Sequence, residues 1–260
     1  MEEHAGLHIA LSAERLGTFL GLPITNTLLS AWLVMSVLII IAIVVGRKPT
    51  LIPGKVQNFF ELIFEFVIGY MSDIFGNRKR ALTFFPFIAT IFLFIATSNL
   101  FDFMPFVGSI TFTHEGETMS LFRPVNTDLN VTLALAIISV ITIEVAGIVA
   151  LGFWKYMNKF FTFSGKTIGQ RFLNLTVGLI EFVSEMSRFI SFSFRLFGNI
   201  FAGEVLLAVV AYFMPYLLPV PLMGFETFVG VVQAAVFAML TLFFLKLAMT
   251  PAHGSGEAHH

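Results

Sequence analysis

Residues 180–207 read IEFVSEMSRFISFSFRLFGNIFAGEVLL, and this stretch decides the fold because it sets charged side chains inside an otherwise apolar helix. At 100° per residue, its polar and small side chains gather on one helical face. That face carries Glu181, Ser184, Arg188, Ser191, Arg195, Asn199 and Ala202. A polar stripe along an apolar helix faces protein or water, because lipid offers it no hydrogen-bond partner. The stretch therefore predicts a membrane helix with a functional face.

The composition of the whole chain is typical of a protein that lies in a membrane. Of its 260 residues, 57% are hydrophobic and only 12% are charged, about half the charged share of a soluble domain. A net charge of −1 with scattered basic residues argues against binding to nucleic acid. The chain has no Cys, and its six His lie near the termini or in one loop. We therefore expect no disulfide, no metal centre and no cofactor.

Five apolar segments are each long enough to cross a bilayer core, which takes roughly 20 helical residues. They are residues 26–46, 81–105, 128–154, 171–214 and 219–251, after an outer N-terminal segment, 1–25. A sixth segment, 53–80, has Gln57, Glu61 and Glu65 four residues apart among Phe and Ile, which is typical of a helix on the membrane surface. The sequence predicts an all-α integral membrane protein with one membrane domain, 1–260.

The last two segments have unusual lengths. Residues 171–214 would form a helix of about 66 Å, roughly twice the bilayer core. Pro215, Pro219 and Pro221 separate this segment from the next one. We therefore expect a long, strongly tilted helical hairpin.

The orientation follows from the basic residues. Three groups of Lys and Arg all fall on one side if the spans alternate, and the positive-inside rule makes that side cytoplasmic. The groups are Arg47, Lys48 and Lys55; Arg78, Lys79 and Arg80; and Lys155, Lys159, Lys166 and Arg171. The N-terminus is then outside and the C-terminus is cytoplasmic.

Charges inside apolar segments are candidates for function by default. Arg195 is the strongest candidate, since it lies mid-segment on the polar stripe; the alternative is a structural ion pair with Glu181 or Glu185. Arg188 could instead reach the headgroups with its long side chain. Glu185 lies off the stripe and is interpreted as structural, while Glu204 could serve helix packing alone.

The run SFRLFGNIFAGE, residues 193–204, resembles the signature of subunit a of F-type ATP synthases. The resemblance extends over most of the chain. It includes PGKVQNFFELIFEFV as a surface helix, NLFDFMP and PVNTDLNVTLALA as segments along an outer half-channel, and VVQAAVFAMLTLFFL as the last helix.

The resemblance implies a role for each matching residue. Arg195 matches the family's essential arginine, with Asn199 and Gln233 as polar neighbours. Glu181 matches a carboxylate on the cytoplasmic side and Glu204 one on the opposite side. The outer entrance would be lined by Asn99, Asp102, Asp128 and Asn130.

One position departs from a common family pattern. Many members carry His on the last helix, seven residues before Gln233, where this chain has Glu226. Counted from the Pro-rich turn, Glu204 and Glu226 reach similar depths in an antiparallel hairpin. We expect them to behave as one coupled site; the alternative is that Glu226 lies in water at the end of its helix.

The resemblance implies a proton-conducting stator subunit that is not an enzyme on its own. Its partners would be a ring of c subunits, b subunits of the peripheral stalk, the soluble ATPase head and membrane lipid, in a bacterial cytoplasmic membrane. The alternative function is a secondary ion transporter or channel that acts alone, although no paired halves with broken helices are visible. A purely structural scaffold would not need these intramembrane charges.

Overall fold

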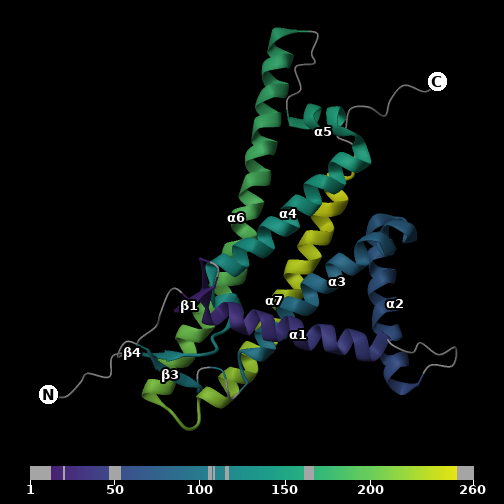
Figure 1. Ribbon diagram of the computed structural model, residues 1–260. Helices are drawn as coiled ribbons and strands as arrows, with labels where there is room; N and C mark the ends of the chain where they lie inside the picture. Colours follow the sequence, from purple (N-terminus) through teal and green to yellow (C-terminus); the bar gives the residue numbers. More distant parts are fainter. Residues whose placement is uncertain are drawn as a thin grey trace. The chain divides into compact units, whose positions relative to one another are not determined.

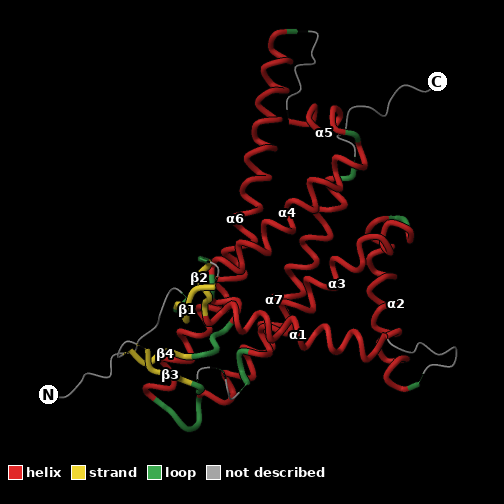
Figure 2. Tube along the Cα trace, viewed as in Figure 1, coloured by secondary structure: helices red, strands yellow, loops and turns green. Residues whose placement is uncertain are grey.

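The computed structural model describes residues 13–19, 21–46, 54–104, 107, 109–114, 117–160 and 167–250. In this part of the chain helices dominate, and strands form two short hairpins (Figure 2). The prediction of an all-α membrane protein is confirmed. The chain divides into two compact units, Met1–Thr132 with Phe194–Ala238, and Leu133–Ser193 with Met239–His260. We call them unit 1 and unit 2.

Five helices of the described residues are long and apolar enough to cross a membrane, in agreement with the predicted number. They are α1 (Asn26–Gly46), α3 (Arg78–Phe101), α4 (Leu129–Leu151), α6 (Ile168–Phe213) and α7 (Pro219–Ala248). Two further helices are α2 (Lys55–Phe75) and α5 (Phe153–Phe160). At 46 residues, α6 is one continuous helix, about 69 Å long at 1.5 Å per residue.

Two predicted boundaries are corrected by the structure. The segment 53–80 is not one helix, because α2 ends at Phe75, Gly76 follows with a φ of 65°, and α3 begins at Arg78. The Asn77 side chain accepts hydrogen bonds from the backbone of Lys79 and Arg80, so it caps α3. The segment 128–154 is also interrupted, since Gly152 has a φ of 84° and α5 starts directly after it.

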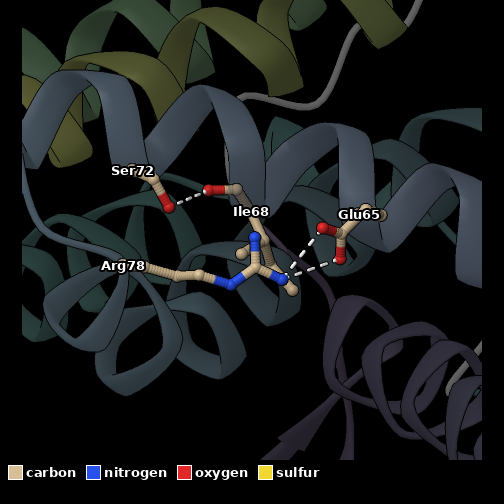
Figure 3. A network of polar contacts seen from close by, with 4 residues as sticks. All are labelled: Glu65, Ile68, Ser72 and Arg78. Atoms are coloured by element: carbon tan, nitrogen blue, oxygen red, sulfur yellow. Dashed lines mark hydrogen bonds and ion pairs between the residues drawn. The ribbon is translucent and has the colours of Figure 1, made fainter.

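Within unit 1, α2 folds back beside α3 (Figure 1). Ring contacts join the two helices, with Phe64 on Phe85 at 5.4 Å and Phe75 on Phe84 at 5.8 Å between centroids. Arg78 donates to both carboxylate oxygens of Glu65, at 2.9 and 3.1 Å (Figure 3). Because both partners of this pair are exposed, it adds little to stability. The aromatic packing therefore holds α2 in place.

The N-terminal end of α1 is fastened to the segment that precedes α4, also within unit 1. The core there consists of Ala31, Val34, Phe101 and Val125. Polar contacts surround it: Thr27 donates to Asp128 at 2.8 Å, and Asn26 donates to the Ser120 carbonyl at 3.3 Å. These contacts hold the short 3-10 helix η1 (Val125–Thr127) against α1 and α3.

The two hairpins were not predicted from the sequence. Strands β1 (Arg15–Phe19) and β2 (Leu22–Thr25) pair antiparallel, as do β3 (Thr111–His114) and β4 (Glu117–Ser120). Each strand has only four or five residues, too few for a clear alternating pattern in the sequence.

Candidate functional site: a cavity between three helices of unit 1

A cavity of about 140 Å³ opens between α3, α6, α7 and the η1 segment. All of its lining residues belong to unit 1. Polar groups in the wall are Asn99, Asp102, Thr127, Asn199, Glu204 and Glu226. The apolar part of the wall includes Phe103, Ile200, Leu207, Met223 and Val229. A cavity of this volume with polar groups in its wall has room for several water molecules.

Asn99 ties three elements together at the cavity wall. Its side chain is 1% exposed, and its Nδ2 donates to the Gly230 carbonyl of α7 at 2.8 Å. Its Oδ1 accepts from Asn126 of η1 at 2.6 Å. The close approach requires Gly at 230, since a Cβ there would lie 2.9 Å from the Asn99 Cβ. Asn99 therefore fixes the wall as well as lining it.

Three carboxyl groups face this cavity from three helices. Asp102 follows the end of α3, Glu204 lies on α6 and Glu226 lies on α7. In each, one buried oxygen has no hydrogen-bond partner among the residues that the structure describes: Asp102 Oδ1, Glu204 Oε2 and Glu226 Oε1. A buried polar atom without a partner is costly unless water or an ion satisfies it. The wall is therefore suited to holding water and passing a cation or a proton.

Helices α6 and α7 meet closely beside this group. A Cβ built on Gly203 would lie 2.7 Å from Glu226 Oε1, so the Glu226 carboxylate occupies the space that a side chain at 203 would fill. Since Glu204 is the next residue on α6, the two glutamates line the same part of the wall. The similar depth inferred by counting from the turn agrees with this placement.

Asp128 and Asn130 do not belong to the described cavity wall. Asp128 accepts hydrogen bonds from Thr27 Oγ1 at 2.8 Å, from the Asn130 backbone at 2.9 Å and from Asn130 Nδ2 at 3.0 Å. This pattern is a helix cap at the start of α4. The structure thus gives both residues a structural task, and their part in ion entry stays a prediction.

Arg195 and Gln233 also lie outside the lining of the described cavity. Arg195 is exposed on α6, whereas its neighbour Leu196 is completely buried. Gln233 is buried on α7, and its Nε2 has no hydrogen-bond partner among the described residues. Asn199 connects the two regions in sequence, since it lies four residues from Arg195 and lines the cavity.

The model of the family described as ATP synthase A chain matches residues 28–246. The chain belongs to this family. The match covers all five membrane-length helices except for two residues at the start of α1 and two at the end of α7.

Individual relatives of this family agree over nearly the full length. The chain is 34% identical to ATP synthase subunit a of Mycobacterium marinum, over 93% of this chain and 94% of the relative. It is 31% identical to ATP synthase subunit a of Moorella thermoacetica, over 86% of this chain and 90% of the relative. A third relative, at 33% over 87% of this chain and 74% of its own length, is the sodium ion specific subunit a of Propionigenium modestum. The chain is thus a multi-pass membrane subunit of an ATP synthase.

Unit 2 contains Glu181 and Arg188, which the sequence analysis singled out, and a pair that it did not. Glu181 is partly exposed on α6. The Arg188 side chain is only 17% exposed, lies 3.8 Å from Glu185 and covers the Phe244 ring at 4.4 Å, so it contacts neighbouring side chains of the protein. Glu144 and Tyr156, which form a hydrogen bond with each other, were not predicted as candidate residues from the sequence. The isolated Glu144 in an apolar segment was the signal that could have drawn attention to this pair.

Proposed function

We propose that this chain is the proton-conducting stator subunit of its ATP synthase, with Arg195 between two offset half-channels. A carboxylate on a rotating ring of c subunits takes up a proton from the outer half-channel, and after rotation it releases the proton to the inner one. Proton flow is thereby coupled to rotation and to ATP synthesis in the soluble head. The chain itself performs no covalent step.

The exposure of Arg195 is the observation that carries this proposal. A guanidinium in the middle of an apolar helix is costly in contact with lipid, and Phe194 beside it is also exposed. A partner with carboxylates of its own, such as a ring of c subunits, would cover this exposed charge and keep it away from lipid. Arg suits the task because it stays protonated when desolvated, and a fixed positive charge opposes direct passage of protons.

The cavity of unit 1 is the proposed outer half-channel. Its three carboxyl groups, together with Asn99 and Asn199, supply acceptors and donors for a chain of water molecules. Asp128 and Asn130 would act at its entrance, and Gln233 would assist Arg195. On the other side, Glu181 would receive the proton released from the ring.

The remaining parts of the proposal concern the assembly. The b subunits of the peripheral stalk would hold this chain against the turning ring. The membrane would be the bacterial cytoplasmic membrane, with the N-terminus outside and the C-terminus cytoplasmic, as the Lys and Arg distribution favours.

The test is Arg195→Ala in assembled complexes, in sodium-free vesicles energised by a pH gradient. We expect ATP synthesis to disappear, while passive proton flow through the membrane sector persists or rises. The matched control is Arg15→Ala, since Arg15 is exposed in β1 and far from the polar stripe in sequence. Substantial synthesis by Arg195→Ala, or activity that requires sodium, contradicts the proposal.

A further inference from the structure

A chain of two side-chain amides crosses unit 1, from η1 through α3 to α7. Asn126 of η1 donates to Asn99 of α3 at 2.6 Å, and Asn99 donates to the Gly230 carbonyl of α7 at 2.8 Å. Asn126 and Asn99 are 0% and 1% exposed, so bulk water does not compete for either bond. Asn126 does not belong to the described cavity lining, and the half-channels proposed above give it no task. We call these three groups the amide chain.

The amide chain can run in only one direction. A backbone carbonyl accepts and cannot donate, so Asn99 must offer its Nδ2 to Gly230 and its Oδ1 to Asn126. Asn126 must therefore donate through Nδ2, since its Oδ1 would place two acceptors against each other. This direction leaves Asn126 Oδ1 without a hydrogen-bond partner among the described residues. The carbonyl of Gly230 thus imposes it, and position 126 requires a donor.

The η1 end of the amide chain is fixed to α1. On one side of η1, the Arg123 backbone donates to Ser30 Oγ at 3.2 Å. On the other side, Asp128 accepts from Thr27 at 2.8 Å. Between them, Val125 is completely buried in the core that η1 shares with α1. Asn126 therefore donates from a point that cannot easily move.

The α7 end of the amide chain lies one helical turn from Glu226. Gly230 follows Glu226 by four residues, so the two share a face of α7 and are separated by about 6 Å along its axis. The Glu226 carboxylate in turn occupies the space beside Gly203 of α6. Helix α7 held at Gly230 cannot slide or turn without moving Glu226 relative to Gly203 and Glu204.

Loss of the Asn126 donor would release this hold. A buried acceptor that loses its donor is costly, and Asn99 lines the cavity, so its amide would turn toward water there. The bond from Asn99 to Gly230 would then weaken, because one planar amide cannot keep its Nδ2 on α7 while its Oδ1 seeks a new donor.

We propose that Asn126 is a positioning residue of the outer half-channel: through Asn99 it holds α7 at the depth where Glu226 shares a cavity wall with Glu204. This inference rests on the proposed function. It gives η1 a task in proton flow, although Asn126 itself lies outside the described cavity lining.

The test measures passive proton flow in sodium-free vesicles that carry the assembled membrane sector, after removal of the soluble head. Asn126→Leu nearly keeps the size of the side chain and cannot donate. We expect flow to fall by about tenfold or more, since misplacing a reacting group by about 1 Å can cost roughly a hundredfold. In a Glu226→Gln background the same substitution should change flow by less than about twofold, because the group that Asn126 positions is already gone.

A residue that serves the fold alone would give the same loss in both backgrounds, and that result overturns the inference. Normal flow in Asn126→Leu overturns it as well. Asn58→Leu is the matched control, because Asn58 is exposed on α2. Ring and stalk subunits are quantified in every sample. The smaller Asn126→Ala repeats the measurement if Asn126→Leu does not assemble, and failure of both to assemble shows that Asn126 serves folding alone.

Gly230→Ala interrupts the amide chain at its other end, since the new Cβ would lie 2.9 Å from the Asn99 Cβ. We expect the loss of flow seen in Asn126→Leu, and little further loss in the double variant, because both changes act on one chain of contacts. Gly224→Ala is the control on the same helix, where a Cβ meets no described atom within 4 Å. Losses that multiply in the double variant would mean that Asn126 does not act through α7.

Glu226→Gln by itself separates this inference from the function on which it rests. If Glu226→Gln impairs flow and the dependence of Asn126→Leu on Glu226 is absent, only the inference fails. If Glu226→Gln conducts normally, the proposed outer half-channel does not use Glu226, and the inference falls with it.

Discussion

At the scale of single residues, the acidic side chains of unit 1 illustrate how the surroundings of a carboxylate decide its task. Asp128 is satisfied by three donors and caps a helix. Glu204 and Glu226 each keep a buried oxygen without a partner among the described residues. A satisfied carboxylate stabilises the fold, whereas an unsatisfied one in a cavity with room for water is suited to exchanging protons.

The two glutamates of the cavity should act as a unit. We expect Glu204→Leu and Glu226→Leu each to reduce ATP-driven proton pumping by about tenfold or more, and the double variant to lose little beyond that, because coupled groups are not additive. Glu226→His should retain pumping, since an imidazole can relay protons beside a carboxylate. The measurement is the rate of acidification of inverted vesicles. Losses that multiply in the double variant would show two independent sites, and normal pumping by Glu226→Leu would remove Glu226 from the path.

At the scale of elements, the contact between α6 and α7 depends on the absence of a side chain at 203. The Glu226 carboxylate occupies this position, and the Asn99 side chain occupies the corresponding space at Gly230. Small residues allow membrane helices to approach closely, which compensates for the lack of a hydrophobic driving force within lipid. Here the space is used to admit polar side chains.

Gly203→Ala tests this arrangement. The new Cβ would lie 2.7 Å from Glu226 Oε1; because that oxygen ends a flexible side chain, the complex should assemble but pump more slowly. Gly224→Ala on α7 is the control, since its Cβ would meet no described atom within 4 Å. Combining Gly203→Ala with the shorter Glu226→Asp should recover part of the rate. Equal pumping by the two alanine variants would show that the Glu226 position is not critical.

At the scale of the whole molecule, the membrane orientation follows from charge and from the number of spans. Five helices are membrane-length candidates and α2 is not among them, so α2 should lie on one membrane surface. The rings that join α2 to α3 and the polar residues Gln57, Glu61 and Glu65 on α2 are consistent with a surface helix.

Single cysteines can report this orientation, because the natural chain has none. Lys55→Cys and Lys155→Cys should react with a membrane-impermeant maleimide only from the cytoplasmic side, and Ser109→Cys only from outside. All three positions are exposed. Lys55 and Lys155 on opposite sides would mean that the span count is wrong by one.

The features that could be predicted from the sequence are those that depend on local periodicity. The five spans, the polar stripe of α6 and the matching depths of Glu204 and Glu226 follow from helical geometry and from counting residues, because an α-helix repeats every 3.6 residues. The orientation in the membrane was also predicted locally, because Lys and Arg are concentrated in the connections on one side of the spans. The break at Gly152 was missed, since a single left-handed residue does not alter the surrounding hydropathy.

Chain-distant contacts were decided only by the tertiary structure. Asn99 meets Gly230 across 131 positions of sequence, and this contact brings the end of α3 into a cavity with the two glutamates. Tyr156 and Glu144 likewise become partners only because α5 folds back on α4. The sequence by itself therefore determined which side chains are charged and on which helical face they lie. Packing determined which of them are satisfied and which face a cavity, because that depends on the closeness of neighbouring backbones, a property that no single segment carries.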